Sequence, residues 1–446
     1  MKKTVNKRDS FRSHWGFVLA CIGSAVGMGN IWMFPTRVSA YGGGSFLIPY
    51  FICVIVLGFS GEIGEMAFGR HTRSGPVGAF GAACASRGEE KRKIGQLLGC
   101  IPMLGALAMA IGYTVVVGWI LKYMIGTFTG TTLAPASVEG FGEEFGTMAS
   151  AFGNNIWQLS ALAFCFFVMV FGIGKGIEKA CKIMMPLFFL MFLGLAVYLI
   201  FQPGSIEGYR YIFRIDGDAI QNPMTWVYAL GQAFFSLSLA GNGTIIYGSY
   251  LKEDADIVNS AWKVALFDTM AAMLAALVII PAMATAGQEL TTGGPGLLFI
   301  YLPYIFKKIP GGSILVMIFF IAVFFAGITS LVNLFEAPIS TLQDVFHLKR
   351  AQAVGIIGII GTVVSISIQG IVSGWMDFVS IYFCPLGAGM AGIMFFWVYK
   401  DNTARKAIQT GRMKAIGPWL EPMTKWVFCG LTFLVFILGI CFHGIG

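Results

Sequence analysis

Eleven apolar stretches follow one another along the 446 residues of the chain. Each is about 20 residues long, the length of helix that crosses the hydrocarbon core of a bilayer. Hydrophobic residues make up 57% of the chain and charged residues 12%, too few charges for the surface of a water-soluble protein. A transmembrane β-barrel would instead show shorter segments of alternating polarity. The sequence predicts an all-α polytopic membrane protein with spans near residues 14–38, 43–68, 98–125, 155–174, 181–202, 226–250, 260–287, 312–343, 352–373, 376–399 and 423–444.

The formal net charge of +8 is unevenly distributed. Lys and Arg gather before the first span and in the loops around 70–93, 175–182 and 400–425, whereas the loop 126–155 contains glutamates and no basic residue. By the positive-inside rule, this pattern predicts a cytoplasmic N-terminus and, with eleven spans, a C-terminus outside the plasma (inner) membrane. The basic charge is thus a topology signal, and we expect the lipid bilayer as a partner but no nucleic acid. We expect a monomer or a weak dimer.

The first apolar stretch contains the run 23–30 (GSAVGMGN), in which three glycines stand close together. Each glycine weakens a helix by about 1 kcal/mol relative to alanine. Freed backbone groups are tolerated within a membrane only where they meet protein, water, ions or a ligand. The run therefore predicts a broken helix of the kind that forms the binding site of secondary transporters. The alternative is a set of glycines that only improves helix packing.

The sixth apolar stretch is interrupted in the same way, at 231–244 (GQAFFSLSLAGNGT). Its distance of five spans from the first break is what two five-helix repeats would give. We expect one membrane domain over 1–446, with repeats at about 14–202 and 226–399 and an extra C-terminal span at about 423–444. Half-helix N-termini suit a carboxylate and half-helix C-termini suit a cation, so two facing breaks predict a zwitterionic amino acid bound with sodium.

The same segments resemble those of the neurotransmitter:sodium symporter family. The likeness covers the run 23–30 and, in the family's order, 42–50 (GGGSFLIPY), 234–239 (FFSLSL) and 326–330 (AGITS). It implies the LeuT-type 5+5 inverted-repeat fold, with broken first and sixth helices and about 11 transmembrane helices. It also implies sodium-coupled uptake by alternating access. The family commonly has twelve spans, whereas this chain stops after eleven.

The resemblance implies two Na⁺ sites built from hydroxyl and carbonyl oxygens, the ligands that a hard cation prefers. One site would use Gly23, Val26, Ala326, Thr329 and Ser330. The other would use Ala25, Asn30, Ser236 and Asp268. From the residues alone, an alternative remains open for Thr329 and Ser330, whose hydroxyls can bond back to their own helix.

Asp268 stands where the family usually has asparagine. The chloride-dependent members bind chloride nearby through a serine one turn further on, where this chain has Ala272. We infer that the Asp268 carboxylate replaces the anion and that transport is chloride-independent. An aspartate inside a span is a functional hypothesis by default, although a protonated, structural Asp268 is the alternative.

The resemblance also implies a substrate site. The substrate carboxylate would meet the N–H groups of Met28 and Gly29 and the Tyr113 hydroxyl. At Gly241 a relative has a large aromatic residue, so the emptied pocket favours a hydrophobic, aromatic L-amino acid. Small or branched aliphatic amino acids, or another small amine, are the alternative. The full set is Ser24, Ala25, Met28, Gly29, Met109, Tyr113, Phe235, Ser236, Ser238, Gly241, Ser330 and Leu334.

The gates follow from the same resemblance. Arg8 and Asp344 match an inner ion pair, and Asp377 matches the acidic outer gate residue. The arginine partner of that outer residue is replaced by Met33, so Phe235 would close over the site as an apolar lid. Arg37, one turn along from Met33, is a candidate replacement. Glu65 matches a buried glutamate that braces the first break, bonded to backbone N–H groups or protonated.

Two other classes of function are less consistent with the sequence. An ion channel would favour a continuous polar path and subunit symmetry, whereas the polar residues form one isolated cluster. A membrane enzyme would need a nucleophile with a base, or metal ligands, within the spans, and the four histidines lie at or near span ends. We therefore predict a transporter rather than an enzyme, with no catalytic residues.

Overall fold

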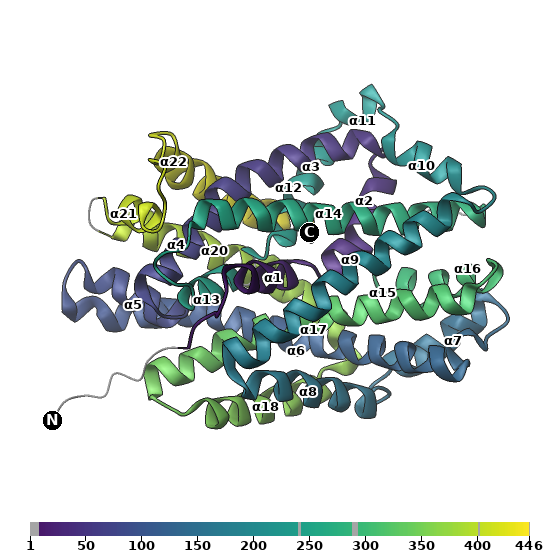
Figure 1. The fold of residues 1–446 in the computed structure, drawn as a ribbon, viewed down its shortest axis with the longest axis horizontal. Helices are drawn as coiled ribbons and strands as arrows, with labels where there is room; N and C mark the ends of the chain where they lie inside the picture. The colour runs from purple at the N-terminus through teal and green to yellow at the C-terminus, as the bar shows by residue number, and fades with distance from the viewer. Residues whose placement is uncertain (1–8, 240–241, 288–292, 400–401, 446) are drawn as a thin grey trace.

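The computed structural model describes residues 9–239, 242–287, 293–399 and 402–445. Within these ranges the chain forms helices and connecting turns and contains no strand. The long helices run side by side along the longest axis of the molecule, as Figure 1 shows. The fold is thus an all-helical bundle, as the sequence predicts.

Each of the eleven expected spans coincides with a helix or with helices in tandem. The first four are α1 (His14–Ala25) with η1 (Gly29–Met33) and α2 (Phe34–Ala40); α3 (Gly44–Leu57) with η2 (Gly58–Glu62) and α4 (Ile63–Thr72); α6 (Arg92–Thr129); and α8 (Asn155–Val170). The next four are η5 (Ile173–Ile177) with α9 (Glu178–Ile200), α12 (Pro223–Ser236) with α13 (Gly243–Ser249), α14 (Ile257–Thr285), and α17 (Gly312–Phe346).

The last three spans are α18 (Arg350–Ser367); α19 (Val372–Phe378) with η9 (Val379–Phe383), α20 (Cys384–Ile393) and η10 (Met394–Val398); and α22 (Leu420–Pro422) with η11 (Met423–Phe428) and α23 (Cys429–Cys441). Shorter helices lie between the spans: α5 (Pro76–Ala85), η3 (Glu89–Lys91), η4 (Thr131–Leu133), α7 (Val138–Ala149), α10 (Ser205–Phe213), α11 (Gly217–Gln221), α15 (Gly294–Gly296), η7 (Leu297–Tyr301), α16 (Leu302–Lys308), η8 (Gln369–Ile371) and α21 (Thr403–Gln409).

Eight of the described helices are long and apolar enough to cross a membrane, and the bent pair His14–Ala25 and Gly29–Ala40 adds a ninth. The two halves of that pair are bent by 57°. The span expected at 155–174 is a shorter apolar helix, because Gly172 turns the chain with a positive φ of 80° before the next span begins.

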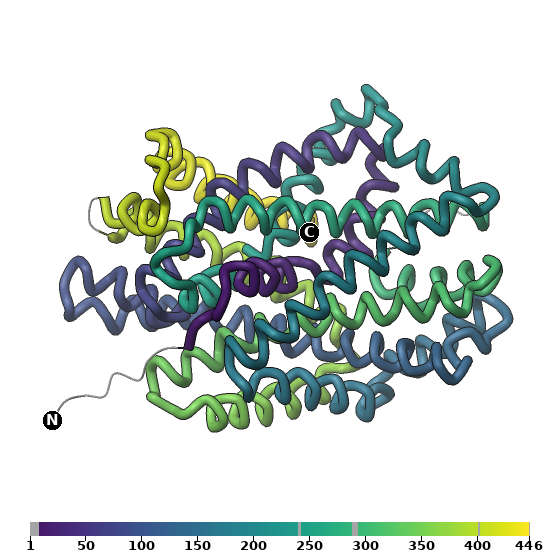
Figure 2. The backbone as a smooth tube through the Cα atoms, viewed as in Figure 1, coloured from purple at the N-terminus to yellow at the C-terminus, as the bar shows by residue number. Residues whose placement is uncertain are grey.

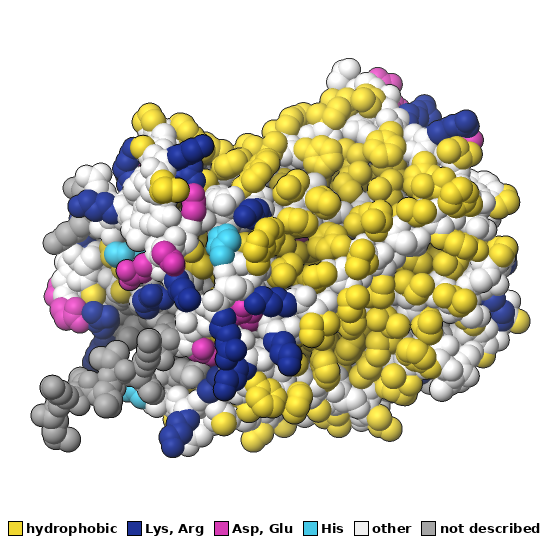
Figure 3. Space-filling model, viewed as in Figure 1, with side chains coloured by type: hydrophobic (Ala, Val, Ile, Leu, Met, Phe, Trp, Pro, Cys, Tyr) yellow, Lys and Arg dark blue, Asp and Glu magenta, His cyan; other side chains and the backbone are white. Residues whose placement is uncertain are grey.

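The surface matches a membrane environment. Hydrophobic side chains cover a broad band of the face drawn in Figure 3, and Lys and Arg gather at the end of the molecule where the N-terminus lies. The tube in Figure 2 places α1 at the centre of the bundle, where it packs against α13, α14 and α17. The two broken helices therefore meet in the interior.

Candidate functional site

The first break lies between Ala25 and Gly29. The C-cap residue Val26 is extended, with φ −70° and ψ 109°, and its N–H still donates to the carbonyl of Ile22 at 2.7 Å. The Gly27 N–H then donates to the Asn30 side chain at 3.0 Å, which holds the start of the second half-helix. The helix restarts as the π-helical segment η1. This geometry confirms the break that the glycines predict.

The second break spans residues 237–242, between the end of α12 and the start of α13. Ser238 and Asn242 both have positive φ values, 56° and 50°. A left-handed conformation is uncommon for residues other than glycine and costs about 1–3 kcal/mol at functional sites. A kink that only improved helix packing would not require two strained residues of this kind.

Ser330 on α17 faces the first break. Its hydroxyl donates toward three carbonyl oxygens, those of Gly23 at 3.2 Å, Ser24 at 3.3 Å and Val26 at 2.9 Å. These carbonyls are released by the end of α1, and two of them are predicted Na⁺ ligands. The alternative that Ser330 bonds back to its own helix is therefore not what the structure adopts.

Thr329 behaves differently from its neighbour. Its hydroxyl donates back to the carbonyls of Phe325 at 2.9 Å and Ala326 at 3.2 Å, both on α17. A side-chain carbon added at Gly23 would nevertheless lie 3.1 Å from the Thr329 hydroxyl oxygen. The five residues predicted for this ion, Val26 among them, therefore lie close together. Only a glycine at position 23 lets α1 approach α17 so closely.

Of the four residues predicted for the second ion, Asn30 and Ser236 bond the carboxylate of Asp268. The Asn30 amide donates to one Asp268 carboxylate oxygen at 2.8 Å and to the Ser236 hydroxyl at 3.0 Å. The Ser236 hydroxyl donates to the other carboxylate oxygen at 2.5 Å. Ala25 lines the adjoining cavity. Three helices, η1, α12 and α14, therefore meet at a fully buried carboxylate.

A cavity of about 440 Å³ opens between the two breaks. The Met28 N–H donates to the Tyr113 hydroxyl at 3.1 Å, and the Ser24 and Ser238 hydroxyls lie 3.2 Å apart across it. Gly29 borders open space. Of the predicted substrate residues that the structure describes, all line the cavity: Ser24, Ala25, Met28, Gly29, Met109, Tyr113, Phe235, Ser236, Ser238, Ser330 and Leu334. Gly241 lies outside the described residues.

Sequence reasoning missed several other residues of this cavity. Trp32, Val116 and Trp119 add apolar surface, and Asn333 bonds the carbonyl of Gly243 at 3.3 Å. Nearby, the Asn242 side chain is buried, and neither of its polar atoms has a hydrogen-bond partner among the residues that the structure describes. Asn242 therefore does not cap α13 through its side chain.

The cavity extends to the expected outer gate. Asp377 and Met33 line the same space, together with Val372, Ser373 and Met376. Arg37 does not replace the missing arginine. Its guanidinium lies 4.0 Å from the ring centre of Tyr228, and no ion pair joins it to Asp377 among the described residues.

The opposite end of α1 is tightly held. Arg8 lies outside the described residues, while Asp344 accepts bonds from the Ser74 hydroxyl at 3.1 Å and the Gly75 N–H at 3.2 Å. The buried Glu178, which sequence reasoning missed, accepts from the N–H groups of Arg12 at 2.6 Å and Ser13 at 3.2 Å. It also accepts from the Ser13 hydroxyl and from Lys182. No sequence motif links residues so distant in the chain.

Two other buried glutamates tie elements together. Glu65 accepts from the Thr244 hydroxyl in α13, rather than from the backbone N–H groups expected at the sequence level. Glu336 accepts from both terminal nitrogens of Arg350, at 2.9 and 2.8 Å, and from the Tyr250 hydroxyl at 2.7 Å. Glu65 therefore contacts the second broken helix, and Glu336 binds the loop after it.

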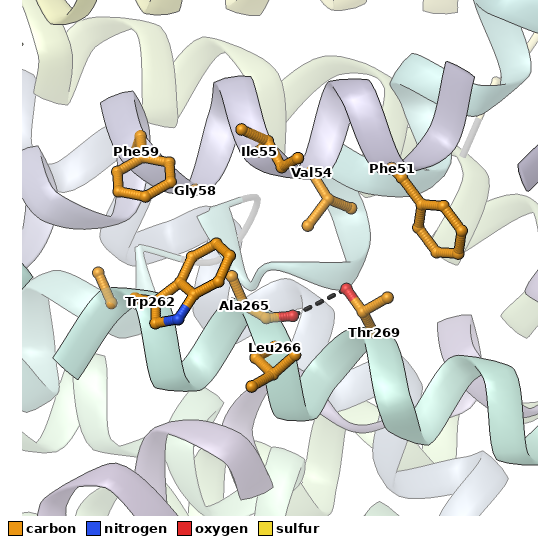
Figure 4. A pocket seen from close by; sticks show the side chains of 10 residues that line it. Phe51, Val54, Ile55, Gly58, Phe59, Trp262, Ala265, Leu266 and Thr269 are labelled. Atoms are coloured by element: carbon orange, nitrogen blue, oxygen red, sulfur yellow. Dashed lines mark hydrogen bonds between the residues drawn. The ribbon is translucent and has the colours of Figure 1, made fainter. Parts of the chain in front are cut away.

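Other hollows lie away from the breaks. Figure 4 shows a cleft of about 160 Å³ between α3 and α14, lined by apolar side chains that include Phe51, Ile55 and Trp262. The hydroxyl of Thr269 in this cleft is already bonded to the Ala265 carbonyl at 2.8 Å. Apart from this hydroxyl and the indole N–H of Trp262, the lining of the cleft is apolar, and it provides no carboxylate, ammonium or cluster of oxygens for an amino acid or an ion. The cavity between the breaks is therefore the candidate site.

Comparison with known proteins agrees with this geometry. The model of the sodium:neurotransmitter symporter family matches residues 8–144 and 138–443. An uncharacterised sodium-dependent transporter of Bacillus subtilis is 33% identical over 349 residues, 77% of this chain and 74% of the relative. One from Methanocaldococcus jannaschii is 29% identical over 440 residues, 93% of this chain and 86% of the relative.

A solved structure is similar over nearly the whole chain. It is the crystal structure of MhsT in complex with L-phenylalanine, with a TM-score of 0.84 and 30% sequence identity. The match covers 96% of this chain and 99% of that one. The chain belongs to the sodium:neurotransmitter symporter family and has its fold, that of a multi-pass, sodium-dependent membrane transporter.

Proposed function

We propose that the protein is a sodium-coupled symporter that imports a hydrophobic, aromatic L-amino acid. The observation that carries this proposal is the cavity between the two breaks, in which the Met28 N–H and the Tyr113 hydroxyl already meet at 3.1 Å. A backbone N–H at the start of a half-helix and a phenolic hydroxyl are the donors that a carboxylate needs. The carboxylate would lie between them, with its ammonium group toward Ala25, Ser236 and Ser330.

Two Na⁺ ions accompany the substrate in this proposal. The first is bound by Gly23, Val26, Ala326, Thr329 and Ser330, where released carbonyls and hydroxyls supply neutral oxygens. The second is bound by Ala25, Asn30, Ser236 and Asp268. Such oxygens suit a hard monovalent ion. In the structure, Asn30 and Ser236 donate to the Asp268 carboxylate and Ser330 donates to the Val26 carbonyl, so these donors occupy the oxygens that would bind the ion.

Transport is chloride-independent in this proposal, because Asp268 brings a negative charge of its own. Position 272 is a buried alanine, which offers no side-chain donor to an anion. A carboxylate held by Asn30 and Ser236 compensates the charge of a sodium ion directly.

The aromatic preference rests on the size and lining of the site. Phe235, Met109 and Leu334 line the cavity with apolar side chains. The family resemblance further implies extra space at Gly241, where a relative has a large aromatic residue. The related MhsT structure contains L-phenylalanine. The unpartnered amide of Asn242 is available for a polar ring substituent such as the indole N–H. Small or branched aliphatic amino acids remain the second candidate substrates.

The structure supports alternating access from the outer side. The cavity reaches Asp377 and Met33 but none of the residues around Glu178. The basic end in Figure 3 supports a cytoplasmic N-terminus. We further propose that the two repeats cover about 14–202 and 226–399, and that 423–444 is an additional span of the plasma membrane protein.

Uptake into proteoliposomes tests the function. A labelled aromatic amino acid should accumulate only under an inward sodium gradient, and this uptake should persist when gluconate replaces chloride. Gly241→Phe should lose tryptophan uptake while keeping alanine or leucine uptake, since a buried phenyl ring fills the space in question. Absence of any amino-acid uptake under a sodium gradient would refute the symporter, and equal loss of all substrates in the variant would refute the assignment of Gly241.

A further inference from the structure

Glu62 is another buried acidic side chain of the bundle interior, in addition to Glu65, Asp268 and Glu336. It lies at the end of η2 and is fully buried, yet neither of its carboxyl oxygens has a hydrogen-bond partner among the described residues. Glu65 accepts from Thr244, and Asp268 accepts from two donors. Because buried polar atoms are nearly always partnered, Glu62 requires a separate explanation.

The carboxyl group occupies a narrow apolar slot at the seam between α3 and α14, the seam in which Figure 4 places Gly58 and Ala265. A side-chain carbon added at Gly58 would lie 3.3 Å from the Ala265 methyl and 3.9 Å from a Glu62 oxygen. It would lie 4.0 Å from Leu237 in the second break. Glu62 also ends a π-helical turn, a distortion that is frequent at functional sites.

Among the described residues, the groups that face Glu62 include no cation. The titratable neighbours are Cys21 on α1, Glu65 on α4 and Asp268 on α14. Helix η11 packs against η2 through Phe428, and the cation of η11, Lys425, lies over the Trp397 ring instead. An ionised carboxylate in this slot would be unpaired and surrounded by other acids, so the packing favours the neutral carboxylic acid.

We propose that Glu62 is an exchangeable proton-binding site that competes with sodium. The proposal rests on the proposed sodium site at Asp268. A sodium ion there places a positive charge near Glu62, which lowers the cost of the ionised form. The O–H bond of the Glu62 acid then breaks, the proton leaves to water, and the carboxylate retains the electron pair. Because this coupling is reciprocal, a proton on Glu62 weakens sodium binding by the same factor by which bound sodium weakens proton binding.

The exchange of one positive charge for another keeps the charge of the acidic interior constant. Helix α1 carries Cys21 next to this slot and ends at the break after Ala25. A movement of α1 about that break would expose Glu62 to water. The slot is therefore well placed for its proton to exchange during transport.

The test measures proton release on sodium binding. Purified protein in weakly buffered detergent solution receives NaCl or choline chloride, while a pH indicator reports protons and the fluorescence of Trp32 and Trp119 reports binding. We expect sodium to release protons from the wild type and much less from Glu62→Gln. Between about pH 5.5 and about pH 7.5, the half-saturating sodium concentration should fall about fivefold in the wild type and less than about twofold in the variant.

Two controls keep the result decisive. Glu65→Gln changes a partnered glutamate one turn along the same span and should keep the proton release. Glu62→Met fills the slot with an apolar side chain of similar length and substitutes for the glutamine variant if that variant is unstable. Sodium binding without proton release in the wild type, or unchanged release in the Glu62 variants, would overturn the proposal. Absence of sodium-dependent amino-acid uptake would instead overturn the proposed function.

Discussion

Asp268 is the residue on which the proposed ion coupling depends most. Its two carboxylate oxygens receive one hydrogen bond each, from Asn30 and Ser236, and no cationic side chain pairs with it in the described part of the chain. A buried, unpaired carboxylate is costly unless a cation completes its environment. A bound sodium ion would be that cation.

Replacing the carboxylate by an amide should therefore weaken sodium coupling. In Asp268→Asn we expect the half-saturating sodium concentration for uptake to rise by at least about tenfold, equivalent to about 1.4 kcal/mol, because the ion loses a full opposing charge. Uptake by the variant should also become chloride-sensitive. Uptake at graded sodium concentrations, in chloride and in gluconate, measures both effects.

The control for this prediction is the next residue. Thr269→Ala removes a hydroxyl that is already bonded within α14, so it should leave sodium dependence unchanged. If Asp268→Asn transports like the wild type in both salts, Asp268 does not replace the anion.

At the level of residues, the sequence predicted what the family motifs contain. Asn30 bonds Ser236, and Ser330 bonds the carbonyl of Val26, so the structure brings residues of each motif together. Their role as sodium ligands stays a prediction. The sequence analysis missed Glu62, although an acidic residue within a span is a functional signal. It was missed because the nearby Glu65 matched the buried glutamate of the family. Arg37 could not be placed, since its direction is set by packing on Tyr228 rather than by local sequence.

At the level of elements, the start of α1 is held by a buried carboxylate, that of Glu178. Glu178 begins α9 and accepts the N–H groups and hydroxyl that precede α1. Gly16 permits this approach, since any side chain there would collide with Glu178. The glycines in the sequence predicted both broken helices. The Glu178 anchor could not be predicted, because it joins residues more than one hundred and sixty positions apart and no local sequence pattern marks it.

Weakening the anchor should let the start of α1 detach more often from α9. Hydrogen bonds to a charged group contribute about 1.5–3 kcal/mol each, so in Glu178→Gln we expect the rate at which thiol reagents modify the buried Cys21 to rise by about tenfold. Mass spectrometry of the peptide that contains Cys21 measures that rate. Glu207→Gln, which breaks an exposed pair with Arg210, is the matched control. An unchanged rate in Glu178→Gln would show that the anchor does not govern this detachment of α1.

At the level of the whole molecule, the two sides of the bundle are unequal. One side contains the cavity that reaches from the breaks to Asp377, whereas the opposite side is joined by the Glu178 anchor and by the Glu336–Arg350 pair. The proposed ligands lie between these sides, on α1, η1, α12, α14 and α17. A sodium ion would thus link both broken helices to the rest of the bundle at once.

Sodium should therefore stabilise the folded protein as a whole. A ligand at about one hundred times its dissociation constant adds about 2.7 kcal/mol, since it binds the native state alone. For a chain of this size, this corresponds to a rise in the melting temperature of about 2–5 °C. Thermal unfolding of the purified protein in NaCl, compared with choline chloride and KCl at equal ionic strength, measures the rise.

Ser330→Ala should reduce the rise in melting temperature, because the Ser330 hydroxyl joins α17 to the carbonyls of the first break. Ser340→Ala, whose hydroxyl bonds only within α17, should retain it. An equal rise in KCl would assign the effect to salt rather than to sodium sites between the two breaks.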